Sequence, residues 1–295
     1  MIKALMTTMK PESFLISFVA VSTGAALASL YGPMHWGRYS LTLLGMIFMH
    51  GGANVLNDYF DYRHDVDTSH VPGSFGTGGR VIAQKMLTPN QVLGVGLLLY
   101  ALALPVGIYL TVAVGFPVLI LGIVGFLVGF FYTGSPIGFK YFALGEPAVF
   151  MMWGPLMVSG AYYVQRSSFS GQPAWVSIPI GILVALILFA NNIRDLTSDT
   201  RARVRTIATV LGKESAVKLY SLLILVSYGI TLLLIATAQL SLWGLITLIS
   251  LPLALKLIKQ MQIAVLPDAD AKTAQLNTVY GLLLVISIVL QRFFS

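Results

Sequence analysis

The sequence predicts an all-α, polytopic membrane protein: a bundle of nine transmembrane helices with a cap over its cytoplasmic side. Hydrophobic residues make up 57% of the 295 residues, charged residues make up 10%, and the mean hydropathy is +0.84. Soluble domains are less apolar and much more highly charged. Apolar runs long enough to cross a membrane recur along the whole chain, so one integral membrane domain over residues 1–295 is expected.

Each predicted span is an apolar segment of about 20 residues, the length that crosses a hydrocarbon layer of ~30 Å as a helix. Glycine and proline inside several spans are tolerated in a bundle of helices. The first span is too long for a signal-peptide core and lacks a small-residue cleavage site after it, so we expect it to be retained. The predicted spans are 13–32, 38–57, 91–110, 113–132, 146–165, 175–194, 216–237, 239–257 and 275–293.

The basic residues behind the net charge of +7 concentrate on one side of these spans. Fifteen of the eighteen Lys and Arg residues fall on the side of the N-terminus, which leaves Arg38, Arg166 and Arg292 on the other. Cytoplasmic loops carry such an excess of positive charge. We therefore expect a protein of the inner (cytoplasmic) membrane that has its N-terminus in the cytoplasm, contacts the lipid bilayer and binds no nucleic acid. Cysteine is absent, which excludes disulfides and thiol chemistry.

Two long cytoplasmic connections divide the chain into similar halves. One runs from about 58 to 90 and the other from about 195 to 215, and each begins with acidic residues and continues into basic ones. Spans one to four and five to eight form the halves, about 1–140 and 141–260, and the ninth span is added. Because four spans separate the two acidic stretches, both lie on the same face, where the two connections are expected to form the cap.

The first acidic stretch carries a regular row of oxygen ligands. If the second span continues as a helix through residue 65, Asn57, Asp61 and Asp65 share one face at four-residue spacing, and Asp58 points about a quarter-turn away. Like charges at this spacing repel each other, so the row favours a bound cation.

The second acidic stretch repeats the pattern with Asp195 and Asp199. Clustered oxygen ligands suit Mg²⁺ with a phosphate on its other side. Two such sets facing each other could hold Mg²⁺ ions that bridge a diphosphate as it leaves. In a membrane, this chemistry suits ionisation of an allylic diphosphate, whose carbocation needs an apolar cavity that keeps out water.

Several basic and aromatic residues on the same side are candidates for substrate contacts. Arg80 ends a Gly-rich segment that is either a lid over an anion or a flexible connection. Lys140 is predicted to contact the diphosphate and Tyr132 or Tyr141 to line the pocket; the alternative is a membrane-surface anchor. The arginines of the second connection, which are Arg194, Arg201 and Arg205, are predicted to bind substrate, although Arg201 and Arg205 could equally set topology alone.

The pattern Asn57-Asp58-x-x-Asp61-x-x-x-Asp65, paired with Asp195-x-x-x-Asp199, resembles the two aspartate-rich motifs of the UbiA superfamily of intramembrane prenyltransferases. The resemblance covers nearly the whole chain, with one motif after the second span and the other after the sixth. It implies that Asn57, Asp61, Asp195 and Asp199 hold Mg²⁺. Asp58 and Asp65 are the other acids of the first motif, and we expect them, with Lys140 and Tyr141, to take part in catalysis.

The flanking residues are similar to the branch of this superfamily that prenylates 1,4-dihydroxy-2-naphthoate to give demethylmenaquinone. They include Asn191-Asn192-Ile193-Arg194-Asp195 and Gly78-Gly79-Arg80-Val81-Ile82. Many members of that branch have Gly in place of Asp65 and an Asp two residues later, whereas this chain has both Asp65 and Asp67. Another acceptor, such as a 4-hydroxybenzoate-like ring, therefore stays an alternative.

The resemblance thus implies a polyprenyl diphosphate and an aromatic acceptor as partners, and no obligate protein partner. Two other classes were weighed against it. A secondary transporter would fit the repeated halves, but its site is expected near the midplane and not at the helix ends. A phospholipid-type transferase would carry an Asp-Gly-x-x-Ala-Arg pattern, which is missing here.

Overall fold

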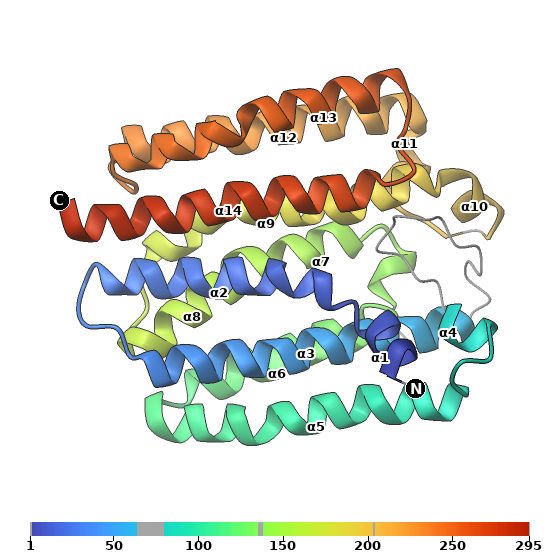
Figure 1. Ribbon diagram of the computed structural model, residues 1–295, viewed down its shortest axis with the longest axis horizontal. Coiled ribbons are helices and arrows are strands. Elements are labelled where there is room, and N and C mark those ends of the chain that lie inside the picture. The colour runs from blue at the N-terminus through green and yellow to red at the C-terminus, as the bar shows by residue number, and fades with distance from the viewer. Residues whose placement is uncertain (1, 64–79, 135–137, 203, 295) are drawn as a thin grey trace.

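The computed structural model describes residues 2–63, 80–134, 138–202 and 204–294 as a bundle of helices (Figure 1). No strand occurs in these ranges, where a single bridge pairs Phe142 with Arg205. The predicted all-α class is therefore confirmed.

The long helices lie side by side along the longest axis of the molecule, and the short ones gather mainly at one end (Figure 1). In chain order the helices are α1 (Ile2–Met9), the 3₁₀ helix η1 (Pro11–Ser13), α2 (Phe14–Ser29), α3 (Trp36–Arg63), α4 (Arg80–Ala83), α5 (Pro89–Val114), α6 (Pro117–Phe131), the 3₁₀ helix η2 (Phe139–Tyr141), α7 (Gly145–Met151), the π-helical turn η3 (Met152–Leu156), α8 (Met157–Arg166), α9 (Gly171–Arg194), α10 (Leu196–Arg201), α11 (Ile207–Leu211), α12 (Lys213–Ala236), the 3₁₀ helix η4 (Leu242–Ser250), α13 (Leu251–Ile263) and α14 (Ala269–Phe294).

Seven of the described helical segments are long and apolar enough to cross a membrane, so the chain is an integral membrane protein. They contain or overlap seven of the nine predicted spans. The other two predictions coincide with helices of a different kind: α6 has only 15 residues, and the segment from α7 to α8 is interrupted by η3. Helix length alone therefore does not establish the predicted number of nine.

The interruption at η3 has a local cause. Pro155 lacks the backbone N–H that a continuous helix would use, and Gly154 has a non-helical ψ of −109°. The backbone of Gly154 lies against Gly181 of α9, where a Cβ added to Gly154 would come within 3.0 Å of the Gly181 Cα. Small residues let helices in membranes approach closely, and here they hold the broken helix against α9.

The main core lies among α2, α8, α9, α12 and α14, where the most buried apolar side chains gather. Helix α14 packs on both α9 and α2, so the last span joins the two halves of the chain (Figure 1). Helix α3 packs mainly on α5, and a smaller core joins this pair to α1 and α4.

Helices α3 and α9, which carry the two acidic stretches at their C-terminal ends, finish at the same end of the bundle. Helices α1, α4, α10 and α11 gather at this end (Figure 1). The acidic stretches are therefore brought together, as the number of spans between them predicts.

The closest backbone contact of the main core predicts a stability effect. A Cβ at Gly24 of α2 would overlap the Val158 carbonyl oxygen and approach the Ala161 Cβ within 2.8 Å. We expect Gly24→Ala to lower the free energy of unfolding by about 1–3 kcal/mol, because α2 and α8 must separate. Thermal unfolding in detergent would measure it. Gly229→Ala in α12, where nothing lies within 4 Å of an added Cβ, is the control; equal melting temperatures for the two variants would contradict this account.

Candidate active site

A cavity of about 730 Å³ runs through the bundle between α3, α5 and α6 on one side and α7 to α9 on the other. The residues of α3 that line it extend from Leu41 to Asp61. At 1.5 Å per residue this length of helix is about 30 Å. The lining is apolar over most of its length and becomes polar at the end where the acidic stretches meet, so the cavity has chemically different ends.

The first acidic stretch divides between two faces of α3. The helix continues through Arg63, so Asn57 and Asp61 both face the cavity. Asp58 is fully buried and faces the N-terminal segment instead, where it pairs with Lys10 (Nζ–Oδ1 3.1 Å) and accepts a hydrogen bond from Thr8 (2.9 Å). Asp58, which the sequence predicted to take part in catalysis, therefore does not line the cavity.

Asp61 is held by two residues that the sequence predicted for the site. Lys140 Nζ lies 2.8 Å from its Oδ2, and the Tyr141 hydroxyl donates to its Oδ1 at 3.0 Å. Burial would lower the pKa of Lys140, but the Asp61 carboxylate outweighs this effect and raises it. Burial and Asp61 also raise the pKa of Tyr141. Both groups therefore keep their protons at neutral pH, and Lys140 neutralises the carboxylate.

A tight turn positions these two side chains. Gly138 precedes η2 with φ of +55°, and the Lys140 backbone N–H donates to the Tyr132 carbonyl at 2.9 Å. The Ala143 N–H donates to the Arg205 carbonyl at 2.7 Å, which ties this turn to the connection after α9. The loop that carries Lys140 is thereby fixed to the loop of the second acidic stretch.

The second acidic stretch is also paired. Arg194 contacts both oxygens of Asp195 at 2.7 Å and the Asn191 Oδ1 at 2.6 Å. Its third partner is Asp270 of α14, at 3.0 Å and with 1% of its side chain exposed. Sequence reasoning missed Asp270, because it placed the start of the last span at residue 275 and α14 begins at Ala269. The sequence signal that could have identified Asp270 is its position as an acidic residue directly before the last apolar segment.

The remaining polar lining closes this end of the cavity. Asp199 and Tyr132 both line it, as predicted. Asn192 donates to Glu146 of α7 at 2.9 Å, which joins α9 to the start of the broken helix. Lys10 is another lining residue that sequence reasoning missed.

Other predicted residues do not meet in the cavity. Arg201 and Arg205 are exposed and do not line it. Asp65 lies outside the described residues, and so does the side chain of Arg80, whose backbone begins α4. The catalytic role predicted for Asp65 and the substrate contacts predicted for Arg80, Arg201 and Arg205 stay predictions.

The oxygen ligands fit Mg²⁺ only as partners of a bound phosphate. Among the described residues, no three His, Asp or Glu side chains converge on one point. Mg²⁺ commonly takes one or two carboxylates, waters and substrate phosphates in place of an all-protein cage. Asn57 and Asp61 on one wall, with Asp195 and Asp199 on the other, offer such a partial set. Asp61 would have to leave Lys140, and Asp195 would have to leave Arg194, to use it.

Comparison with known proteins gives consistent relatives. Residues 16–286 match the UbiA prenyltransferase family. The chain is 29% identical to 1,4-dihydroxy-2-naphthoate octaprenyltransferase of Bacillus subtilis, over 96% of this chain and 91% of that protein. It is 32% identical to UbiA prenyltransferase domain-containing protein 1 of Mus musculus, over 96% and 82%.

The fold is also similar to that of solved structures. A UbiA homologue from Archaeoglobus fulgidus, bound to GPP and Mg²⁺, superposes with a TM-score of 0.69 at 13% identity, covering 97% of this chain and 99% of that one. At this identity the likeness concerns the fold alone.

The pairing of Arg194 predicts a strong effect on stability. We expect Arg194→Gln to lower the free energy of unfolding by about 3–5 kcal/mol, because it removes the guanidinium that pairs with both buried Asp270 and half-buried Asp195. Adding Asp270→Asn should restore part of the loss, and thermal unfolding of the single and double variants would measure this coupling. Lys218→Gln, which breaks an exposed pair with Glu214, should change nothing measurable. Strictly additive effects of the two substitutions would argue against the pairing.

Proposed function

The chain belongs to the UbiA prenyltransferase family and is a prenyl-transferring enzyme, and from this premise we propose that it transfers a polyprenyl group from its diphosphate to 1,4-dihydroxy-2-naphthoate. One observation carries the proposal: the oxygen ligands of both acidic stretches line one end of a long, otherwise apolar cavity. The naphthoate is favoured as acceptor because the Bacillus subtilis relative is named for it. A 4-hydroxybenzoate-like acceptor is the alternative.

The polar end suits a diphosphate that is bound with Mg²⁺. Asn57, Asp61, Asp195 and Asp199 would hold the metal, which would neutralise the pyrophosphate as it leaves. The Archaeoglobus fulgidus homologue is described with GPP and Mg²⁺ bound, and this supports the same dependence here.

Charge balance gives Lys140 its role. If Asp61 held the metal, the Lys140 ammonium would lose its partner at 2.8 Å and would stand beside the diphosphate. The ammonium would then bind an outer phosphate oxygen, and Tyr141 would keep its hydrogen bond to Asp61. Arg194 retains Asp270 when Asp195 is engaged, so it stays in place at the rim.

The reaction then follows in three bond changes. The bond between C1 of the prenyl group and its diphosphate oxygen breaks, and the pyrophosphate leaves with the electron pair. The ring carbon that bears the carboxylate attacks the allylic cation and forms the new carbon–carbon bond. Loss of this carboxylate as CO₂ returns its electron pair to the ring and gives the quinol form of demethylmenaquinone. The apolar walls exclude the water that would otherwise trap the cation.

We place the site at the cytoplasmic face, because the Lys and Arg residues concentrate at this end. In this arrangement α6 and the broken helix from α7 to α8 complete nine spans, and the two connections after α3 and α9 form the cap. The hydrogen bond from Ala143 to Arg205 fixes the connection after α9 to the loop that carries Lys140.

Prenyl transfer can be tested directly with purified protein. We expect Mg²⁺-dependent consumption of a labelled polyprenyl diphosphate and a prenylated product with 1,4-dihydroxy-2-naphthoate, abolished by EDTA. Asp61→Ala and Asp195→Ala should each lower kcat by at least about a hundredfold, because each removes charge stabilisation of the leaving group. Lys213→Met, an exposed residue outside the cavity, is the control.

The outcomes separate the parts of the proposal. Product with 4-hydroxybenzoate alone would change the acceptor and keep the diphosphate chemistry. Full activity in both Asp variants would contradict the metal assignment. No diphosphate consumption under any condition would return a transporter to consideration.

Competition between Lys140 and the metal for Asp61 gives a second prediction. We expect Mg²⁺ without substrate to raise the melting temperature of Lys140→Met more than that of the wild type, because the freed Asp61 binds the ion more tightly and binding stabilises the folded state. Thermal unfolding across a Mg²⁺ series would measure the difference, with Lys213→Met as control. An equal Mg²⁺ response in Lys140→Met and wild type would mean that Asp61 is not a ligand.

A further inference from the structure

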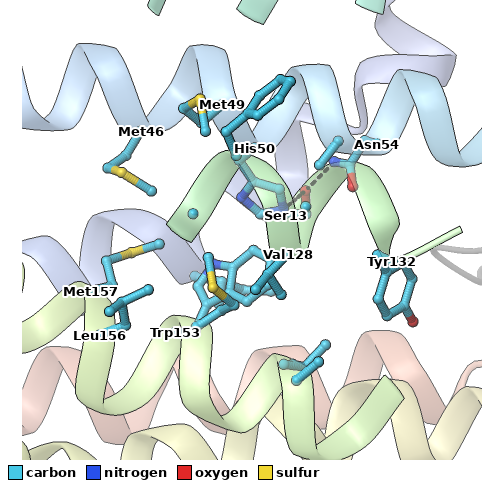
Figure 2. Close-up of a pocket in the computed structure, with 18 of the residues that line it drawn as sticks. Ser13, Met46, Met49, His50, Asn54, Val128, Tyr132, Trp153, Leu156 and Met157 are labelled. Atoms are coloured by element: carbon cyan, nitrogen blue, oxygen red, sulfur yellow. Dashed lines mark hydrogen bonds between the residues drawn. The ribbon is translucent and has the colours of Figure 1, made fainter. Parts of the chain in front are cut away.

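We propose that the aromatic acceptor binds in a chamber directly beside the diphosphate end, where Asn54 orients it and Trp153 packs against its ring. The inference rests on the proposed function and names the residues that would recognise the second substrate. The chamber is the part of the cavity that Figure 2 shows, with Ser13, Met49, His50, Asn54 and Trp153 among its lining residues.

Asn54 is fixed with its oxygen available. Its Nδ2 donates to the Met9 carbonyl at 3.0 Å and to the Ser13 hydroxyl at 3.1 Å, which uses both amide hydrogens. Its Oδ1 makes no hydrogen bond with any described residue, while the side chain lines the cavity (Figure 2). The chamber therefore offers a ligand one preoriented hydrogen-bond acceptor.

His50 stabilises this arrangement, and both of its ring nitrogens have hydrogen-bond partners. Ser13 Oγ gives its hydrogen to the Lys10 carbonyl at 2.7 Å, so it can only accept from His50 Nε2 at 3.3 Å. In a neutral ring the Nδ1 must then accept, and the Ser17 hydroxyl at 2.9 Å donates to it. The neutral Nε2–H tautomer thus satisfies the hydrogen bonds among Ser13, His50 and Ser17. His50 acts as a positioning residue and not as a base.

Trp153 brings an aromatic surface to the same place. Its Nε1–H donates to Ser17 Oγ at 3.1 Å, and its ring lies 5.0 Å from the His50 ring. The residue belongs to η3, the turn that interrupts the helix from α7 to α8. Among the described residues, Trp153 is the one tryptophan that lines the cavity. Met46, Met49 and Met157 supply adaptable apolar walls around it (Figure 2).

The chemistry of the chamber selects among the molecules that share the cavity. A prenyl chain has no donor and would leave the Asn54 oxygen buried without a partner, which is unfavourable. A diphosphate would place negative charge against that oxygen. A flat ring with hydroxyl donors satisfies the oxygen and the aromatic and methionine walls together, so the chamber fits a hydroxylated aromatic acceptor.

Its position also suits attack on the prenyl group. Asn54 precedes Asp61 by seven residues on α3, which is two turns or about 10 Å along the axis and nearly the same face. A ring held by Asn54 would therefore lie just inside the position where C1 leaves the diphosphate.

Acceptor binding without metal or diphosphate provides the test. Quenching of tryptophan fluorescence by 1,4-dihydroxy-2-naphthoate should give a Kd that rises about three- to tenfold in Asn54→Leu, the effect of one lost hydrogen bond. The wild type should discriminate against 1,4-dimethoxy-2-naphthoate, which cannot donate, whereas Asn54→Leu should bind both probes alike. In turnover, KM for the naphthoate should rise and KM for the diphosphate should stay unchanged.

Asn277→Leu is the matched control, because Asn277 is buried in α14, does not line the cavity, and makes no side-chain hydrogen bond within the described structure. A merely structural role of Asn54 would not remove the discrimination between the two probes. Should Asn54→Leu fail to fold, the wild-type comparison of the probes still decides: equal affinity for both overturns the proposal. The proposed function fails separately, when the wild type consumes no prenyl diphosphate.

Discussion

Buried carboxylates in an apolar bundle need positive partners, and this requirement organises the end of the molecule that carries the site. Isolated charges are strongly disfavoured away from water. Asp58 is paired with Lys10, Asp61 with Lys140, and Arg194 serves Asp195 and Asp270 together. Apart from Arg194 with its neighbour Asp195, these pairs join segments distant in sequence: the N-terminal segment to α3, the loop before α7 to α3, and α9 to α14. The same contacts that neutralise the acids therefore hold the helix ends around the cavity.

Helix α3 connects the two functions of this end because its polar residues form two rows. His50, Asn54 and Asp58 follow at four-residue spacing and bond to residues 8–17, whereas Asn57 and Asp61 line the cavity at the diphosphate end. Residues at this spacing share a face. The first row is fully hydrogen-bonded to backbone and side chains apart from the Asn54 oxygen, so it presents a fixed surface. In the second row, Asp61 is held by the Lys140 ammonium, whose place a metal ion could take.

The length of the apolar segments was enough to predict the all-α fold, and the number of spans between the acidic stretches was enough to predict that they meet. Helical spacing predicted the common face of Asn57 and Asp61. It was not enough for Lys10 and Asp270, because their partners lie on other helices and pairing across a bundle leaves no periodic signal. The π-helical turn was also missed, since glycine and proline occur in several spans and only the packing of Gly154 on Gly181 distinguishes this pair. Arg201 and Arg205 are exposed and lie outside the cavity lining, so the substrate contacts that charge near a motif predicts for them stay predictions.

The two parts of the cavity therefore differ in how they must respond to substrate. At the diphosphate end, Asp61 and Asp195 are already neutralised by Lys140 and Arg194. Metal binding there has to exchange one cation for another. Such an exchange conserves charge and avoids exposing an unpaired buried acid, which would be strongly unfavourable. In the acceptor chamber nothing needs to be exchanged, since the His50 tautomer and the Asn54 amide are already fixed by their neighbours. Preorganisation there lowers the entropic cost of orienting the ring, while adaptation is confined to the residues that handle the leaving group.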